Sequence, residues 1–296
     1  MKKPKELVVI SGKGGTDKTS LVASFAVLAK NKVMADCDVD AADLHLILKT
    51  NIQHREIFKA GKRAIIRQKD CTGCGLCLSN CRFNAVKMIQ EKEGEKIFSI
   101  DPISCEGCGV CVHFCPQEAI DFPENVCGEW FISDTRCGPM VHAKLGAAEE
   151  NSGKLVSLVR TQAKKIADEH GQNLIIIDGS PGIGCPVIAS ITGADLVLVV
   201  TEPTLSGEHD FKRVISLTEH FNIPAALCIN KFDLNTSITE RIEKEAQEKN
   251  IILAGRIRYD KEVTYAQVEE KAAVEYNSSQ AGEDIKALWE KLKTIL

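Results

Sequence analysis

Eight cysteines fall in two runs that share one spacing. Each run follows the pattern C-x2-C-x2-C-x3-C, and the members are Cys71, Cys74, Cys77 and Cys81, then Cys105, Cys108, Cys111 and Cys115. Two-residue gaps let three successive thiolates face one centre, while the fourth cysteine cannot reach back to it. A [4Fe-4S] cluster needs four converging thiolates, so the two runs predict two such clusters.

Each cluster would take three cysteines from one run and one from the other. The first cysteine set is Cys71, Cys74, Cys77 and Cys115, and the second cysteine set is Cys105, Cys108, Cys111 and Cys81. Glycines keep both loops slim, so that backbone N–H groups can point at sulfur; they are Gly73, Gly75, Gly107 and Gly109. Two zinc sites are the alternative, but zinc sites pair C-x2-C motifs, which does not suit a triple run repeated twice.

A second group of residues has the composition of a phosphate-binding loop. It comprises Gly12, Lys13, Gly14, Gly15, Thr16, Asp17, Lys18, Thr19 and Ser20. Bare glycines let backbone N–H groups turn towards phosphate oxygens, and the following helix adds the positive end of its dipole. Lys18 would reach the β- and γ-phosphates of ATP, and the Thr19 hydroxyl would ligate Mg²⁺. A glycine-rich turn without a ligand is the alternative.

Strands must alternate with helices on either side of the cysteine runs. Short apolar runs predict strands at residues 7–10, 33–35, 174–177, 196–200, 225–229 and 251–257. Helical spacing of apolar residues predicts helices at residues 21–29, 43–48 and 155–170. Such alternation is typical of the α/β class with a doubly wound, mainly parallel sheet.

The cysteine-rich segment interrupts this pattern. The strands before it need those after it to complete one sheet, so we expect an insertion and not a linker between two domains. The predicted domains are a discontinuous nucleotide-binding domain, residues 1–55 and 126–296, and an inserted α+β domain, residues 56–125. Residues 126–150 are rich in turn residues without a clear period, and we interpret them as the return path from the insertion.

Lys13, directly after the first glycine of the loop, resembles the deviant Walker A motif of the MinD, ParA and nitrogenase-iron-protein group of P-loop ATPases. Residues 36–38 resemble switch I of that family, residues 174–182 its Walker B strand and switch II, and residues 229–233 its base-binding element. The resemblance covers roughly residues 5–50 and 150–296, and the cysteine segment resembles a bacterial ferredoxin.

The resemblance implies roles for single residues. Lys13 would reach phosphates bound by the partner subunit of an ATP-sandwich homodimer, and Asp38 would orient the attacking water. Asp178 would hold Mg²⁺ through water, and the Gly182 N–H would sense the γ-phosphate. The catalytic residues would then be Lys13, Lys18 and Asp38, and the base would be bound by Asn230 and Asp233.

Asp17 departs from the family pattern, which has glycine immediately before the loop lysine. Two unit charges about 4 Å apart interact by roughly 4 kcal/mol at a surface-like dielectric constant. An unrelieved carboxylate would therefore weaken nucleotide binding by about three orders of magnitude. Three interpretations stay open: the chain has lost its ATPase function, it binds nucleotide weakly, or the Asp17 side chain turns outward.

Five cysteines lie outside the two runs. Cys37 and Cys228 are interpreted as packing residues. Cys185 stands where the nitrogenase iron protein has a cysteine that holds a cluster bridging its dimer, but a second such cysteine is not evident, so packing is preferred. Cys127 and Cys137 flank the exit of the insertion and are interpreted as unliganded thiols, with a redox pair as the alternative.

The C-terminal residues have one apolar helical face. In cell-division MinD proteins a C-terminal amphipathic helix binds membrane, but acidic residues dilute the basic face here, so we expect a helix packed on the sheet. The apolar face carries Ile285, Leu288, Trp289, Leu292 and Ile295, and the acidic residues are Glu283, Asp284 and Glu290.

Composition narrows the remaining possibilities. The 296 residues are 44% apolar and 26% charged with a net charge of −4, which makes no electrostatic case for nucleic acid or anionic membrane. The N-terminus lacks the apolar region of a signal peptide, and apolar runs stay short of a membrane span. Thirteen clustered cysteines then predict a cytoplasmic metal-binding or redox protein.

Two functions fit these features. The leading hypothesis is an ATPase homodimer whose nucleotide state is coupled to electron transfer through two [4Fe-4S] clusters, with an unidentified redox protein as partner. The alternative is an ATP-dependent scaffold or carrier that assembles iron–sulfur or other metal clusters and hands them to an acceptor protein. A MinD-like positioning protein is a third possibility and would require membrane binding through the last helix.

Overall fold

Five central parallel strands of the sheet are almost entirely buried. The computed structural model describes residues 3–92, 95–146, 149, 152–276 and 278–296. Strand β1 pairs in parallel with β10 and β11, β10 with β2, β11 with β12, and β12 with β13. Their bounds are β1 Lys5–Ser11, β2 Lys32–Asp36, β10 Leu174–Asp178, β11 Leu196–Thr201, β12 Ala225–Asn230 and β13 Ile252–Ile257. The predicted α/β class is confirmed.

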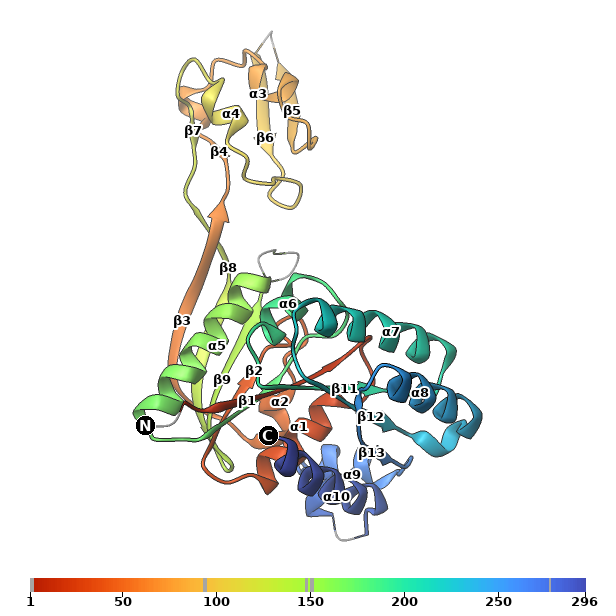
Figure 1. Ribbon diagram of the computed structural model, residues 1–296. Coiled ribbons are helices and arrows are strands. Elements are labelled where there is room, and N and C mark those ends of the chain that lie inside the picture. The colour runs from red at the N-terminus through yellow and green to blue at the C-terminus, as the bar shows by residue number, and fades with distance from the viewer. Residues whose placement is uncertain (1–2, 93–94, 147–148, 150–151, 277) are drawn as a thin grey trace. The chain divides into compact units, whose positions relative to one another are not determined.

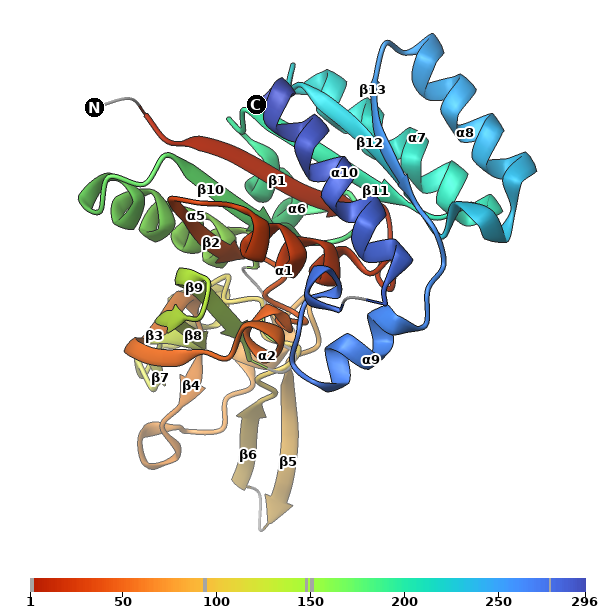
Figure 2. The same ribbon diagram turned by 90° about the horizontal axis from the view of Figure 1, so that it is seen from below.

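Helices cover both faces of this sheet (Figures 1 and 2). One face carries α5 Ser152–Glu169, α6 Cys185–Ile191, α7 Leu205–His220 and α8 Thr236–Glu248. The other face carries α1 Lys18–Leu28, α2 Leu44–Leu48, α9 Glu262–Val268 and α10 Gln280–Ile295. Short 3₁₀ turns lie at Gln68–Asp70, Phe232–Leu234 and Ala273–Glu275.

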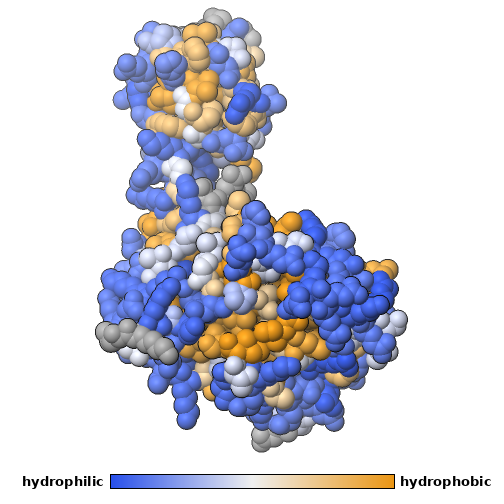
Figure 3. Space-filling view, in the orientation of Figure 1, coloured by the Kyte–Doolittle hydropathy of each residue, from blue (hydrophilic) through white to orange (hydrophobic). Residues whose placement is uncertain are grey.

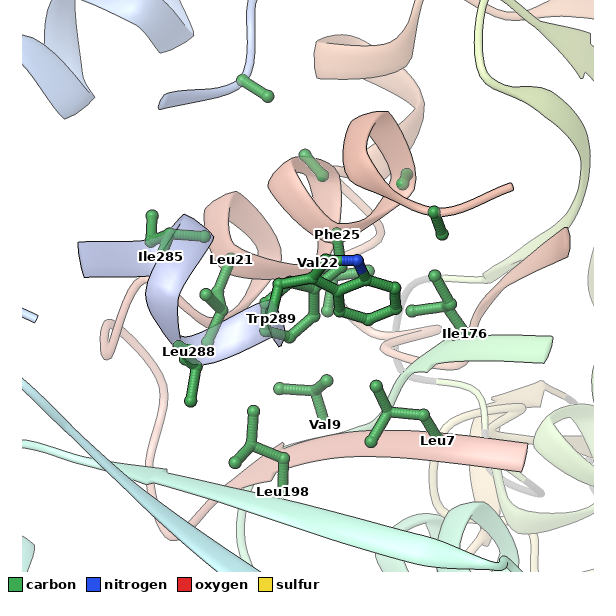
Figure 4. Close-up of a cluster of buried hydrophobic side chains, with 14 of the residues drawn as sticks. Leu7, Val9, Leu21, Val22, Phe25, Ile176, Leu198, Ile285, Leu288 and Trp289 are labelled. Atoms are coloured by element: carbon green, nitrogen blue, oxygen red, sulfur yellow. The ribbon is translucent and has the colours of Figure 1, made fainter. Parts of the chain in front are cut away.

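Helix α10 closes the core on the α1 face. Figure 4 shows Trp289 lying against Phe25 of α1, with ring centroids 5.1 Å apart. Around this pair lie buried side chains from α1, α10 and the sheet, which are Leu7, Val9, Leu21, Val22, Ile176, Leu198, Ile285 and Leu288. The C-terminal helix therefore packs on the sheet, as expected. Among the described helices, none is both long and apolar enough to cross a membrane.

Three further strands extend the sheet beyond β2. The order continues β2-β9-β8-β3, with β9 Gly138–Leu145, β8 Glu124–Thr135 and β3 Asn51–Lys62. Strand β9 is parallel to β2, and the two residues Arg136 and Cys137 join β8 to β9 as a hairpin. Residues 126–150 do include the return path from the insertion, but most of them form two strands, which the sequence analysis did not predict. In β8 the buried residues recur every third position, which hides the alternation that marks a strand.

The chain divides into two compact units. The first contains Met1–Glu56, Glu129–Leu145 and Ser152–Leu296, and the second contains Ile57–Gly128 and Gly146–Asn151. The second unit thus also takes residues 126–128 and 146–151, which lie outside the predicted insertion.

The second unit consists of two short antiparallel pairs and two single-turn helices. Strand β4 Ile65–Ile66 pairs with β7 Ile120–Asp121, and β5 Val86–Lys92 pairs with β6 Glu95–Ile100. The helices are α3 Leu76–Ser79 and α4 Val110–His113, and the core is formed around Phe98. Apolar side chains also reach the surface of this unit, among them Leu76, Leu78, Met88, Ile89 and Phe114. Figure 3 shows such orange residues among blue ones.

Candidate functional site

The phosphate loop, residues 12–19, joins β1 to α1 and borders a cleft of about 560 Å³. A Cβ atom added at Gly14 or Gly15 would meet no atom within 4 Å, so the bare backbone lies open along this stretch. Gly12 is different, because a Cβ atom there would lie 2.3 Å from Cβ of Asp210 in α7. The cleft is also lined by Asp38, Asp40, Asp43, Ser180, Pro181 and Gln267.

Lys18 forms buried ion pairs with two carboxylates at the base of the cleft. Its Nζ lies 2.6 Å from Oδ1 of Asp178 and 3.3 Å from Oδ2 of Asp38, and only 6% of the side chain is exposed. Burial alone would lower the pKa of Lys18, but Asp178 and Asp38 outweigh it and raise that pKa. Lys18 is therefore a charged ammonium, as binding to phosphate requires.

Two buried polar atoms fit a bound cation and phosphates: one belongs to Thr16, which lines the cleft, and the other to Asp178, which pairs with the cleft residue Lys18. Oδ2 of Asp178 and Oγ1 of Thr16 are buried, and neither has a hydrogen-bond partner within the part of the chain that the structure describes. A buried polar atom without a partner is costly, so both atoms favour a ligand in the cleft. Carboxylate and hydroxyl oxygens are ligands that suit Mg²⁺, and Thr19 is half-buried beside them on the cleft wall.

Residues 36–43, called the switch segment here, include the predicted switch I at residues 36–38 and are held in place by Asp36. Its two carboxylate oxygens accept hydrogen bonds from the N–H groups of Asp38, at 3.1 Å, and Leu44, at 3.2 Å. Burial and the neighbouring Asp178 raise the pKa of Asp36 well above its usual range. Burial also raises the pKa of Asp38. Lys18 is thus the positive charge next to Asp36 and Asp38, and it lowers the pKa values that burial raises.

Asp17 has a counterion that sequence reasoning missed. Its backbone is left-handed, with φ of 57°, a conformation that Asp tolerates better than most residues. Its Oδ2 lies 2.9 Å from Nζ of Lys231 and 3.4 Å from Nδ2 of Asn230. The carboxylate at this position is thus paired with a lysine 214 residues away. A contact between residues so far apart in the sequence cannot be predicted from a local sequence pattern.

Lys13 and Gly182 contact groups of their own chain. Nζ of Lys13 lies 3.2 Å from Oγ of Ser206 and 3.8 Å from Oε2 of Glu202. The Gly182 N–H donates to the carbonyl oxygen of Ser11 at 2.8 Å. The roles implied for both residues need a partner subunit or a γ-phosphate, so these roles stay predictions.

The two residues assigned to the base hold loops in place. Nδ2 of Asn230 donates to the carbonyl oxygen of Thr16 at 3.0 Å, and Oδ1 of Asp233 accepts from the Tyr259 N–H at 2.8 Å. A second cavity of about 130 Å³ adjoins the phosphate loop, and it is lined in part by Asn230, Lys231, Arg258, Tyr259 and Gln267. Asn230 lines this cavity, while Asp233 supports one of its loops.

Each predicted cysteine set borders a cavity of its own in the second unit. One cavity is lined by Cys71, Cys74, Cys77 and Cys115, together with Phe98 and Ile120. The other is lined by Cys81, Cys105, Cys108 and Cys111, together with Phe83 and Phe122. The structure thus brings the fourth cysteine of each run to the three cysteines of the other run.

Backbone N–H groups surround several sulfurs. The Ala119 N–H donates to Sγ of Cys115 at 3.3 Å. Burial would raise the pKa of Cys81, but backbone N–H groups from Val86 to Phe83 outweigh it and lower that pKa. Thiolates held by N–H donors in an apolar pocket fit an iron–sulfur cluster.

The remaining cysteines differ in exposure. Cys37 and Cys228 are buried, as expected, and burial raises the pKa of both thiols. Cys185 is exposed at the first residue of α6, so its interpretation as a packing residue was wrong. Cys127 is buried with Sγ 3.1 Å from the carbonyl oxygen of Ala60, and Cys137 is half-buried beside Arg136.

Comparison with known proteins agrees with both halves of this arrangement. Residues 64–122 match the family of 4Fe-4S dicluster domains. The uncharacterised protein MJ0578 of Methanocaldococcus jannaschii is 34% identical over 98% of this chain and 97% of its own length. The match to a dicluster domain decides between the two kinds of metal site and favours iron–sulfur clusters over zinc.

Solved structures share the fold of the whole chain. The cell division protein MinD of Aquifex aeolicus has a TM-score of 0.56 at 17% identity and covers 98% of this chain, with 97% of its own length matched. The septum site-determining protein MinD of Pyrococcus horikoshii, solved in complex with Mg-ADP, has a TM-score of 0.59 at 15% identity, with 99% and 97% covered. At these identities the likeness concerns the fold.

Proposed function

Since the chain belongs to the family of Methanocaldococcus jannaschii protein MJ0578 and joins an iron–sulfur cluster domain to a MinD/ParA-type P-loop fold, we propose that it is an ATPase that couples nucleotide binding to electron transfer. The clusters would supply one-electron chemistry, held by the two cysteine sets. ATP would bind in the cleft, and two copies of the chain would form the working dimer, as Lys13 implies.

The contact of Lys18 with Asp178 and Asp38 carries the proposal. Phosphate oxygens compete with these two carboxylates for the same ammonium group. If Lys18 turned to the β- and γ-phosphates, Asp178 would be free to hold Mg²⁺ and Asp38 would be free to orient water. One exchange of partners would thus prepare both the metal site and the hydrolytic site.

The same exchange reaches the segment that leads to the second unit. Asp38 neighbours Val39, whose carbonyl oxygen accepts from the Leu145 N–H at 3.1 Å. Leu145 is the last residue of the first unit on this strand, and the next residue, Gly146, donates its N–H to the carbonyl oxygen of Cys127 at 2.8 Å. A shift of the switch segment would therefore displace Leu145 and, through it, Gly146, where the chain enters the iron–sulfur domain.

Cluster delivery remains the second candidate, because one cysteine of each set is exposed. Cys74 and Cys108 are accessible to solvent, whereas Cys77 is buried. An exposed thiolate ligand is the one that an acceptor protein or a chelator would reach first. In this alternative, nucleotide binding would time the release of a cluster.

The test combines a binding and a redox measurement on anaerobically purified protein. Calorimetric titration with MgATP is expected to give binding at micromolar concentrations, and Lys18→Ala to abolish it. Redox titration followed by electron paramagnetic resonance is expected to show reversible reduction, with potentials that shift when MgATP is present. Potentials unchanged by nucleotide, together with MgATP-dependent loss of iron to a chelator, would replace this proposal by the delivery function.

A further inference from the structure

Lys231 stands at the centre of a row of alternating charges along the phosphate loop. Its Nζ lies 2.9 Å from Oδ2 of Asp17 and 2.8 Å from Oε1 of Glu202. The other oxygen of Glu202 lies 3.8 Å from Nζ of Lys13. The row therefore reads carboxylate, ammonium, carboxylate, ammonium, and it joins the two residues that set this loop apart, Asp17 and Lys13.

The backbone around Lys231 fixes the position of this ammonium group. Lys231 is left-handed, with φ of 56°, and its N–H donates to Oδ1 of Asn230 at 3.0 Å. The amide nitrogen of the same Asn230 donates to the carbonyl oxygen of Thr16, the residue before Asp17. The loop that carries Lys231 is thus bound to the phosphate loop through the Asn230 side chain as well as through the charge of Lys231.

Asp17 needs such a partner because of where it is attached. It immediately precedes Lys18, and it borders both the cleft and the second cavity. A carboxylate free to rotate there could take up the phosphate-binding N–H groups or repel the incoming phosphates. A lysine that holds the carboxylate at one side removes both effects.

We propose that Lys231 is a positioning residue of the nucleotide site, which holds the Asp17 carboxylate away from the phosphates and so allows an acidic residue in the phosphate loop. Of the three interpretations of Asp17, this proposal corresponds to the one in which the side chain turns outward. The chain is then able to bind nucleotide. It rests on the proposed binding of ATP, but it concerns a pair of residues that the MinD-type motif does not contain.

A double-mutant cycle on the full chain tests the pair. Affinity for MgADP is measured by calorimetry for the native protein, Lys231→Gln, Asp17→Gly and the double variant. Lys231→Gln is expected to lower the affinity about tenfold in the native protein but only about twofold in the Asp17→Gly protein. The effect is modest because the Asp17–Lys231 pair is partly exposed and screened. Asp17→Gly should therefore restore most of the affinity that Lys231→Gln loses, and Lys231→Arg should lose little.

Two controls separate this inference from the function on which it rests. Lys271→Gln removes an exposed lysine that pairs with Glu269 outside both cavities, and it should leave affinity unchanged. Urea unfolding of the same four proteins without nucleotide should also show coupling between positions 17 and 231. If Lys231→Gln lowers the affinity for MgADP by the same factor with Asp17 and with glycine at position 17, the inference is wrong although nucleotide binds. If native protein and Lys18→Ala bind MgADP equally poorly, the nucleotide site itself is wrong.

Discussion

At the scale of single residues, Lys18 determines the charge of the whole cleft. Its ammonium is the partner of both Asp178 and Asp38, and Asp36 lies close behind them. Removing one member of a buried ion pair leaves an uncompensated charge, which costs more than the pair itself contributes. Lys18 therefore supports the fold as well as the proposed function.

Lys18→Met should lower the free energy of unfolding by about 3 kcal/mol at neutral pH. The deficit should shrink on acidification, because burial has raised the pKa values of Asp36 and Asp38 and these groups take up protons readily. Urea unfolding at pH 7 and pH 5.5 measures both effects. Lys164→Met, which removes a half-exposed lysine near Glu6, provides a control, and an equal loss at both pH values would contradict the explanation.

His142 should make stability depend on pH. Burial and the neighbouring His45 lower the pKa of His142 from 6.5 to about 4. The unfolded chain then binds more protons than the folded one between these values, so stability is full above about pH 6.5 and falls towards pH 4. The loss should reach about 3 kcal/mol.

His142→Gln isolates this contribution. The side chain stacks on Phe131 and His45, and its Nε2 lies 2.9 Å from Oγ of Ser133, so glutamine keeps a polar partner there. Urea unfolding followed by tryptophan fluorescence should show a flatter pH profile for the variant than for the native protein. Parallel profiles would show that His142 does not carry the effect.

Residues with local patterns were predictable from sequence, and long-range pairs were not. The cysteine runs and the phosphate loop could be predicted from residue spacing, because most residues of each site lie within one short stretch of sequence. The pairing of Asp17 with Lys231 joins two distant segments and has no such spacing. Cys185 lay in a turn-rich segment whose exposure depends on how α6 begins, so its environment was missed.

At the scale of elements, the two cysteine loops contain glycines with positive φ at two kinds of position, which differ in how much space surrounds them. Gly107 has φ of 60°, and a Cβ atom there would lie 2.2 Å from the carbonyl oxygen of Lys62. Gly75 also has a positive φ, of 78°, but its nearest neighbour would be a ring atom of Phe98 at 3.5 Å. A side chain at Gly107 would therefore clash with backbone, whereas a side chain at Gly75 would be opposed only by the positive φ.

Gly107→Ala should prevent the second cysteine set from binding its cluster, because backbone cannot move aside as a side chain can. Gly75→Ala should cost only the strain of its backbone conformation, of about 1 kcal/mol. Iron content per chain and the visible absorption of anaerobic protein measure the outcome. We expect about half the native iron in Gly107→Ala and nearly all of it in Gly75→Ala; equal iron in both would contradict the steric argument.

The elements that sequence analysis missed lack the usual strand signature. In β8 the buried residues are Cys127, Trp130 and Ser133, three positions apart and not two. In β3 nearly every residue is exposed, so no apolar face marks it. The central strands were found because burial on both faces makes them continuous apolar runs.

At the scale of the whole molecule, the iron–sulfur unit interrupts the unit with the P-loop fold between residues 36–43 and strand β10. The chain enters it through β3 and leaves it through β8, and after β9 it returns to it at Gly146, the residue that follows Leu145. Val39 therefore lies before the insertion in sequence and contacts the residue where the chain returns.

Leu145→Pro should separate the two activities without abolishing either. Proline lacks the N–H that Leu145 donates to Val39, whereas Leu145→Ala keeps it. The proline variant should bind MgATP and hold its clusters, but the shift of their potentials on adding MgATP should disappear. Leu145→Ala should retain the shift, and a shift retained in both variants would show that the signal takes another route.

The ion pairs of Lys18 also have a kinetic consequence. An arriving nucleotide meets a lysine whose bonds to Asp178 and Asp38 must break before the phosphates can take their place. Association then includes a rearrangement within the protein, so its observed rate should level off as nucleotide concentration rises. Stopped-flow mixing would read that plateau directly. The carboxylates that serve hydrolysis would thus also act as a timer, which sets how often the cleft can accept a nucleotide.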